Sequence, residues 1–225
     1  MLLKNNTHKI FCIGLNKTGT TSLGMFLEQQ GSLVESQRKG ELLLKDYFDR
    51  NFNAIINHCK KSHSVVYQDV PFSLPLTYPH LDNAFPESKF ILTIRENSDV
   101  WFESILKFHS DFYNNGKIPT YESLKNSKYV YPGWSWKLMH DVFINDKSEM
   151  YSKNEFVDVY ENHVESVKNY FKNNPDKLLI IDVSKNDDLL KLCKWLKIKT
   201  DKSSFPHISS KDILSLNYNC KFLKG

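Results

Sequence analysis

The chain has 225 residues, of which 40% are hydrophobic and 25% are charged, so it is too apolar for a disordered tail and long enough to bury a sizeable core. Its 30 Lys and Arg against 26 Asp and Glu are spread along the chain, without the basic stripe or recognisable module of a nucleic-acid binder. No apolar run approaches the ~18–20 residues that cross a bilayer, and the first residues lack the apolar core of a signal peptide. We therefore expect a cytoplasmic protein with one domain over residues 1–225 that binds neither nucleic acid nor a membrane.

Four apolar runs predict buried β-strands. They cover residues 9–15, 64–69, 89–95 and 177–183. Near-continuous apolar runs are typical of parallel strands that are covered on both faces. Helix-like stretches lie between them, at residues 20–30, 41–61, 74–84, 98–114, 152–173 and 187–197. The alternation predicts an α/β fold of three layers, in which helices flank a mostly parallel central sheet.

Residues 113–146 break this rhythm and predict an insertion that covers one end of the sheet as a lid or acceptor-side loop. The segment shows little periodicity and is rich in aromatic residues, among them Tyr129, Tyr131, Trp134 and Trp136. Such rings can stack on a sugar or on a flat aromatic alcohol. An equally good interpretation is that they fill a small subsidiary core.

Cysteine usage favours neither disulfides nor a structural metal site. Cys12, Cys59, Cys193 and Cys220 lie far apart and include no CxxC pair and no histidine at zinc spacing. This pattern predicts reduced thiols and no bound metal.

The strongest functional signal is the turn after the first predicted strand, GLNKTGTTSL at residues 14–23. Where a strand runs into a helix, successive backbone N–H groups and the helix dipole attract an anion. Gly19 lets the backbone approach the anion, and Lys17 adds a full positive charge. A blander alternative is a tight turn, capped by threonine, that exposes a lysine. The turn predicts a phosphate-binding loop made of Asn16, Lys17, Thr18, Gly19, Thr20, Thr21 and Ser22.

This loop differs from the common ATP-binding pattern. The pattern GxxxxGK[ST] places its lysine after the last glycine and uses its hydroxyl to hold Mg²⁺, whereas here Lys17 precedes Gly19. No acidic residue closes an apolar strand in the usual magnesium-holding manner, although Asp69 is a partial candidate. A magnesium-dependent kinase of a small molecule or nucleotide is therefore an alternative, but a weaker one.

A second candidate anion site lies at the end of the strand at residues 89–95. Arg95 ends this strand, and ligands of open α/β sheets bind beyond the carboxyl ends of the strands. Ser104 lies on the following helix, at the edge of its apolar stripe, and should point toward the sheet. Alternatively, Arg95 pairs with Glu96 or Asp99, and Ser104 merely packs. The stripe consists of Trp101, Ile105, Phe108 and Phe112.

The run IGLNKTGTTSL resembles the 5′-phosphosulfate loop of sulfotransferases that use 3′-phosphoadenylyl sulfate (PAPS). The resemblance covers most of the chain, is strongest at residues 10–31 and 65–108, and is closest to the branch with a DxP motif, here residues 69–71. It implies a fold similar to the P-loop nucleotide hydrolases, with PAPS as co-substrate and no metal ion. It also implies that Lys17 contacts the 5′-phosphate and the oxygen bridging to sulfate, that residues 18–22 wrap that phosphate, and that Arg95 and Ser104 bind the 3′-phosphate.

The catalytic base is less clearly indicated. Cytosolic members of the family carry a histidine where this chain has Asp69, and a free aspartate, with a pKa of ~3.9, accepts an alcohol proton poorly. Burial would raise that pKa and Lys17 would lower it, so Asp69 is interpreted either as the base or as a residue that orients the acceptor or caps a helix. Among the histidines, His80 and His207 are the outside candidates, whereas three are predicted to be ordinary packed or surface residues: His109, His140 and His163.

Together these residues predict a sulfotransferase that moves a sulfuryl group from PAPS to a hydroxyl or amine of a small-molecule or carbohydrate acceptor. Lys17 would stabilise the leaving phosphate, and Asp69 would take the acceptor's proton. Besides the kinase, the other alternative is a non-catalytic nucleotide-binding protein. The oligomeric state is left open.

Overall fold

The computed structural model describes residues 8–144 and 149–207, and within them four strands form one sheet. The strands are β1 (Ile10–Cys12), β2 (Val66–Tyr67), β3 (Lys89–Thr93) and β4 (Leu178–Ile181), in the spatial order β2-β1-β3-β4. Every pairing is parallel, which confirms the predicted sheet. Each strand lies within its predicted apolar run but is shorter, since the outer residues of the run belong to loops.

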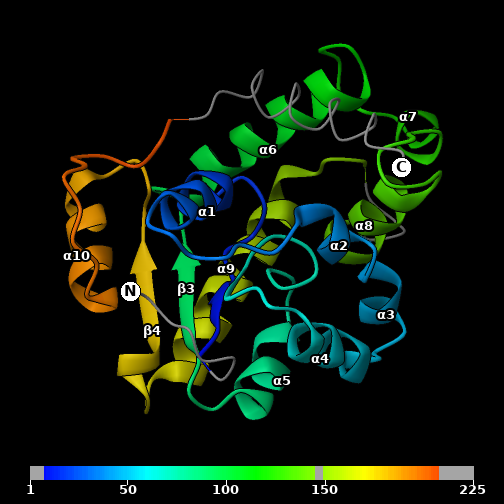
Figure 1. Ribbon diagram of the computed structural model, residues 1–225. Helices are drawn as coiled ribbons and strands as arrows, with labels where there is room; N and C mark the ends of the chain where they lie inside the picture. The colour runs from blue at the N-terminus through cyan, green and yellow to red at the C-terminus, as the bar shows by residue number, and fades with distance from the viewer. Residues whose placement is uncertain (1–7, 145–148, 208–225) are drawn as a thin grey trace.

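The order of the strands reverses at β1. Ile10 pairs with Val66 of β2 on one side and with Lys89 of β3 on the other. The chain therefore leaves β1 toward one neighbour and later returns on the opposite side, which makes β1 the switch point where such sheets bind ligands. The carboxyl ends of β3 and β4 point toward the end of the molecule where α6 (Ser98–Tyr113) lies (Figure 1).

Helices cover both faces of the sheet, as alternate side chains of β1 show. Phe11 and Ile13 pack with α3 (Leu44–Phe48), α4 (Phe52–Lys61), α5 (Thr77–Ala84) and α9 (Lys153–Phe171). Ile10 and Cys12 point to the opposite face, onto α1 (Thr20–Gln29) and α10 (Asn186–Leu196). A 3₁₀ turn, Pro175–Lys177, leads into β4. This arrangement confirms the three-layer α/β fold.

The helix predicted at residues 41–61 is instead three short helices. α2 (Gln37–Glu41) begins earlier than predicted, and α3 and α4 follow it. Arg50 has a left-handed backbone conformation with φ of 56°, which an α-helix cannot contain. Asn51 then donates its side-chain amide to Asp46 at 3.0 Å and closes the turn. This turn separates α3 from α4. α2, at the start of the same segment, reaches the cavity described below.

The aromatic segment at residues 113–146 is not irregular throughout, although its last two residues lie outside the described part of the chain. It contains α7 (Tyr121–Lys125), which begins with a capping box, and α8 (Trp134–Phe143). On α8, Trp134 and Leu138 pack in the same core cluster as Phe11, whereas Met139 and Phe143 pack with residues of α6. The spacing of these four side chains is helical, which the sequence interpretation overlooked.

Cys12, Cys59 and Cys193 are buried free thiols, as predicted, and Cys220 lies outside the described residues. Burial raises the pKa of the Cys12 thiol to about 12, so this thiol stays protonated at neutral pH. Within residues 8–144 and 149–207, no three His, Cys, Asp or Glu side chains come together as ligands for a metal ion. Over the same ranges, no helix is both long and apolar enough to cross a bilayer.

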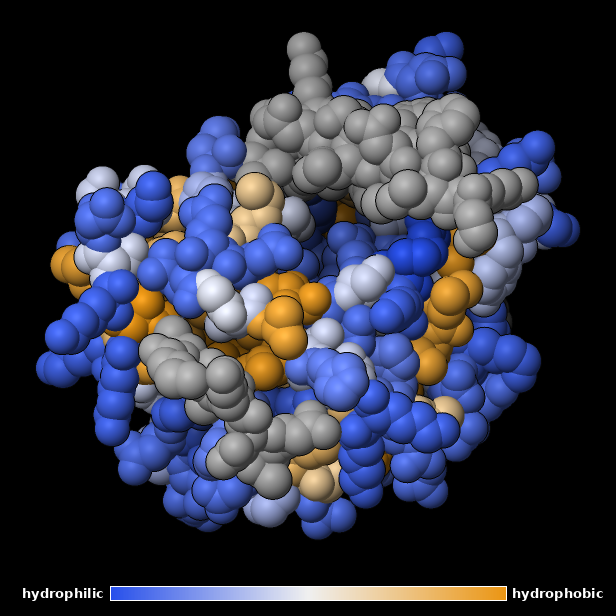
Figure 2. Space-filling model, viewed as in Figure 1, coloured by the Kyte–Doolittle hydropathy of each residue, from blue (hydrophilic) through white to orange (hydrophobic). Residues whose placement is uncertain are grey.

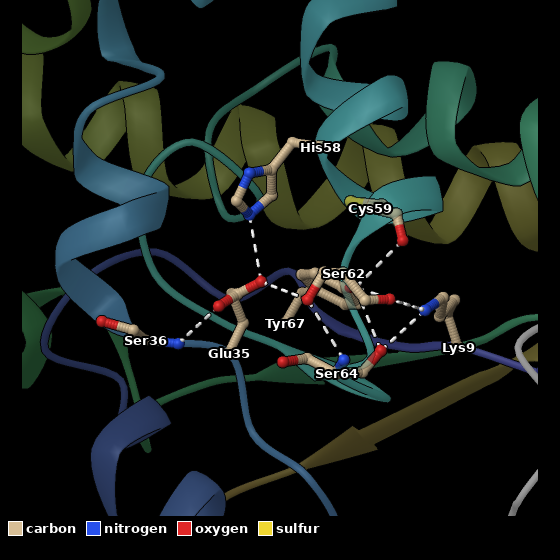
Figure 3. A network of polar contacts seen from close by, with 8 residues as sticks. All are labelled: Lys9, Glu35, Ser36, His58, Cys59, Ser62, Ser64 and Tyr67. Carbon is tan, nitrogen blue, oxygen red and sulfur yellow. Dashed lines mark hydrogen bonds and ion pairs between the residues drawn. The ribbon is translucent and has the colours of Figure 1, made fainter.

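A polar network ties the amino ends of β1 and β2 to α4, away from the loop at residues 14–22 (Figure 3). Glu35 accepts hydrogen bonds from Ser62 Oγ at 2.6 Å and from the Ser36 N–H at 2.9 Å, and its carboxylate lies 3.0 Å from His58 Nε2. The Lys9 ammonium donates to the Ser64 carbonyl at 2.6 Å. Burial acts to raise the pKa of Glu35, but the hydrogen bonds from Ser62 and Ser36 and the nearby His58 outweigh it and leave the pKa lowered.

We expect Glu35→Gln to lower the free energy of unfolding by about 1–3 kcal/mol at pH 7, because its donors lose a charged acceptor. The folded pKa of Glu35 lies below the unfolded value of ~4.3, so its contribution is present above that pH and is lost as the pH falls through the folded pKa. Urea unfolding at pH 7 and at pH 3 measures both effects. Glu28→Gln on the exposed side of α1 is the control; an equal loss in both variants would contradict the assignment.

Candidate active site

A cavity of about 460 Å³ opens at the carboxyl edge of the sheet, beside the switch point at β1. Its walls come from the loop after β1 and from α1, α2, α6, α8 and the segment after β4. Figure 2 shows a hollow between the surfaces over α1 and α2, with mostly hydrophilic residues around its visible rim. Every residue that the sequence predicted to bind the donor or to act in catalysis lines this cavity, with the exception of Thr18.

The backbone of the loop after β1 requires glycine at residue 19. Gly19 has φ of 99°, and a Cβ atom there would lie 2.1 Å from Cγ2 of Val183. The left-handed backbone and this close contact both exclude a larger residue. α1 begins directly afterwards, at Thr20, without a side-chain cap. The N–H groups of its first turn, which have no partner within a helix, are therefore available to an anion in the cavity.

Thr18 is the predicted loop residue that does not line the cavity. Its buried hydroxyl donates to the Leu15 carbonyl at 2.6 Å and lies 2.6 Å from Thr93 Oγ1 of β3. Its backbone N–H donates to the same carbonyl at 3.2 Å. Through these contacts Thr18 holds the loop against β3, and its hydroxyl does not face the cavity.

Lys17 places a cation close to Arg95 inside the cavity. Its ammonium group lies over the Phe108 ring of α6, 3.8 Å from the centroid. Its backbone carbonyl accepts a hydrogen bond from Arg95 Nε at 2.8 Å. Burial and, secondly, the charge of Arg95 lower the pKa of Lys17 to about 8, against an opposing effect from Asp69. An anion bound between the two cations would relieve their repulsion.

Arg95 and Ser104 are fixed by contacts between the loop, α6 and α9. The Arg95 N–H donates to the Tyr160 hydroxyl at 3.0 Å, and the Trp101 indole N–H donates to the Asn16 carbonyl at 2.9 Å. Ser104, one helical turn after Trp101, is thereby brought to the cavity wall. Of the two alternative partners that the sequence offered for Arg95, Glu96 and Asp99, the second instead pairs with Lys153 at 2.8 Å.

Asp69 follows β2 and is nearly buried, with 8% of its surface exposed. Its Oδ1 accepts hydrogen bonds from Asn16 Nδ2 at 2.6 Å and from the Val70 N–H at 2.7 Å. Burial raises the pKa of Asp69, although these two hydrogen bonds and Lys17 act to lower it. The carboxylate is therefore a better proton acceptor than a free aspartate would be.

His109 and His163 are poorly placed to replace Asp69. His109 lines the cavity, but the Tyr151 hydroxyl lies 2.8 Å from its Nδ1, and burial followed by the charge of Lys17 lowers its pKa to about 3. His163 is buried, with Nε2 2.7 Å from a backbone carbonyl just after β1. His207 lines the cavity and is exposed. A histidine with a pKa near 3 is a weak base at neutral pH.

The sequence analysis missed a second buried carboxyl group in the cavity, Glu41 at the end of α2. Gln37 donates to its Oε1 at 3.0 Å, Tyr129 donates to the same oxygen, and Arg38 Nη1 lies 3.1 Å from its Oε2. Burial and then the charge of Asp69 raise the pKa of Glu41 to about 7, while Tyr129, Arg38 and Gln37 act to lower it. The spacing of Gln37 and Glu41, four residues apart, is the signal that could have indicated a helix here.

Comparison with known proteins identifies a family for the chain. The family model described as a sulfotransferase domain matches residues 9–213 of the chain. A search of curated proteins finds no significant match. The matched range includes the loop at residues 14–22 and all the other residues that line the cavity.

We expect the affinity for adenosine 3′,5′-bisphosphate to fall about tenfold per pH unit above pH 8, because Lys17 in the free protein loses its proton there. The phosphates, whose second pKa is ~6, do not change charge in this range. Calorimetric titrations from pH 7 to 9.5 measure the trend. Lys17→Arg is the matched control, since a guanidinium stays charged and should remove the decline. The same decline in both proteins would contradict the role of Lys17.

Proposed function

The chain belongs to the sulfotransferase domain family, and we propose that it transfers a sulfuryl group from PAPS to a hydroxyl or amine of a small-molecule or carbohydrate acceptor. Family membership supports the general reaction, sulfuryl transfer. The observation that carries the finer proposal is that two cationic clusters and a buried carboxyl group with a raised pKa line one cavity.

The two clusters match the two phosphate-bearing ends of the donor. We assign the 5′-phosphosulfate to Lys17 and the first turn of α1, where backbone N–H groups and the helix dipole favour an anion. We assign the 3′-phosphate to Arg95, which follows β3, and to Ser104 of α6. An arginine guanidinium suits this position because it presents a fork of donors to phosphate oxygens. Arg95 Nε donates to the Lys17 carbonyl, and the two Nη groups would donate to the phosphate.

In the proposed reaction, the bond between sulfur and the bridging phosphate oxygen breaks as a bond forms from the acceptor oxygen to sulfur. Negative charge grows on the bridging oxygen, and Lys17 together with the N–H groups of α1 would stabilise it. The leaving group is adenosine 3′,5′-bisphosphate, already a stable anion. By analogy with phosphoryl transfer, positioning and charge stabilisation supply most of the catalysis.

Asp69 is the base that we propose for the acceptor's proton. Its interaction with Lys17 brings it near the reacting end of the donor, and burial raises its pKa toward that of an effective base. Asn16 and the Val70 N–H both bind Oδ1. These contacts orient the carboxylate, and Oδ2 would receive the proton.

The general proposal is tested by supplying PAPS labelled in its sulfate, together with a set of phenols and methyl glycosides, with and without EDTA. We expect labelled sulfate on an acceptor and equal rates in both conditions. Lys17→Ala should abolish transfer while the protein stays folded by circular dichroism. Mg²⁺-dependent turnover of ATP would instead support the kinase, and binding of adenosine 3′,5′-bisphosphate without any turnover would support a non-catalytic protein.

We expect Asp69→Asn to lower kcat by about 10²–10⁴-fold, the usual contribution of a general base, without changing the affinity for adenosine 3′,5′-bisphosphate. The asparagine oxygen can accept both hydrogen bonds that Oδ1 accepts now, and asparagine tolerates the left-handed backbone at this position, φ 62°. The exposed Asp158→Asn on α9 is the control. A kcat within threefold of the parent enzyme would remove Asp69 from the mechanism.

A further inference from the structure

A continuous wall of aromatic rings lines one side of the cavity. Phe108 stacks on Phe112 with 5.7 Å between centroids, and Phe112 meets the edge of Tyr129 at 5.2 Å. Tyr129 in turn lies 5.5 Å from Trp134. All four rings line the cavity, whereas Tyr131 and Trp136 of the same segment are absent from its lining. The wall joins α6 to α8, two elements that the chain brings together from separate segments.

The two ends of this wall carry different chemistry. At one end the Lys17 ammonium lies on the Phe108 ring, where the reacting sulfuryl group is proposed to lie. At the other end the Trp134 indole N–H donates to the Glu41 carbonyl at 3.0 Å, and the Tyr129 hydroxyl donates to the Glu41 carboxylate. A molecule lying along the rings would therefore have the transfer site at one end and the polar groups of α2 at the other.

At the polar end of the wall, the carboxylate of Glu41 is paired with the guanidinium of Arg38. Arg38 lies 3.1 Å from the Glu41 carboxylate and stacks on Tyr129, with 4.8 Å from its guanidinium carbon to the ring centroid. Gln37 donates to the other carboxylate oxygen at 3.0 Å. Glu41 itself is buried, with 2% of its surface exposed. This end thus offers hydrogen-bonding groups and ring faces but no cation without a carboxylate partner among the residues described.

Building on the proposed function, we propose that this wall is the acceptor subsite and that it takes an uncharged alcohol with a ring and a second hydroxyl group, bound by Gln37 and Glu41. Sugars and hydroxylated phenols share this chemistry. Ring faces stack on either kind of ring, and a neutral hydroxyl can donate to Glu41 and accept from Gln37. A carboxylate at this end would lose its hydration, face the negative charge of Glu41 and find no free cation to compensate it.

The selectivity is tested with two matched pairs of acceptors, each differing by one carboxylate. The pairs are methyl glucoside with methyl glucuronide, and 4-hydroxybenzyl alcohol with 4-hydroxybenzoate. The protein is saturated with adenosine 3′,5′-bisphosphate, and binding of each acceptor is measured by tryptophan fluorescence at pH 8. The affinities are then compared with kcat/KM for transfer from PAPS. We expect the neutral member of at least one pair to bind at least tenfold more tightly than its carboxylate partner. The pair that shows this difference indicates whether the acceptor is a sugar or a phenol.

Glu41→Gln should reduce that selectivity to about threefold or less and leave the affinity for adenosine 3′,5′-bisphosphate unchanged. The exposed Glu103→Gln on α6 is the matched control and should retain the selectivity. Gln37→Leu supplies a second variant, which should weaken binding of the neutral acceptor at least tenfold even if Glu41→Gln fails to fold. The inference is overturned if the carboxylates bind as well as their partners, if none of the four compounds binds, or if Gln37→Leu has no effect.

Nucleotide binding separates a failure of the proposed function from a failure of the proposed acceptor subsite. Titration of adenosine 3′,5′-bisphosphate alone precedes the acceptor experiments. Failure to bind this nucleotide contradicts the proposed function itself. Normal nucleotide binding combined with the wrong acceptor selectivity contradicts the acceptor subsite and leaves the donor site intact.

Discussion

The closeness of Lys17 and Arg95 at the switch point of the sheet is the constraint on which the rest of the site depends. The hydrogen bond from Arg95 Nε to the Lys17 carbonyl, at 2.8 Å, ties the loop after β1 to the end of β3. The hydroxyl contact between Thr18 and Thr93 and the contact of Gly19 with Val183 fix the same loop against β3 and the segment after β4. Burial and, secondly, the repulsion from Arg95 lower the pKa of Lys17. A bound polyanion would relieve this repulsion.

The two ends of the cavity differ in chemistry, and we propose a separate task for each. Positive charge and helix N–H groups lie where α1 begins and β3 ends. The aromatic wall and the carboxyl group of Glu41 lie toward α2 and α8. Asp69, whose Oδ1 contacts Asn16 of the loop, links the two ends. Family membership supports sulfuryl transfer in general and does not by itself assign either end. The aromatic end depends on contacts between distant segments, such as those of Trp134 with Glu41 and of Tyr129 with Phe112. We propose that this end selects the acceptor.

The gathering of Lys17, Arg95 and the loop in one cavity could be predicted from sequence because its determinants are local. A strand, a glycine, a lysine and several hydroxyls within ten residues fix the loop, and the position of Arg95 at a strand end places it at the same edge of a parallel sheet. The inward turn of Thr18 could not be predicted, since its hydroxyl meets Thr93, 75 residues further along the chain. Glu41 was missed for the same reason: its place is set by Trp134, 93 residues away, whose indole N–H donates to the Glu41 carbonyl. Such contacts leave no periodic signal in the sequence.

The most direct measurement is a crystal structure of the protein with adenosine 3′,5′-bisphosphate. The account predicts one nucleotide that spans the cavity, with its 5′-phosphate within hydrogen-bonding distance of Lys17 and of the N–H groups at residues 20–22, and its 3′-phosphate bound by Arg95 and Ser104. It also predicts that the space beside the aromatic wall stays open for an acceptor. A nucleotide bound elsewhere, or one whose 3′-phosphate lies away from Arg95 and Ser104, would contradict the central claim that these two clusters grip a single donor.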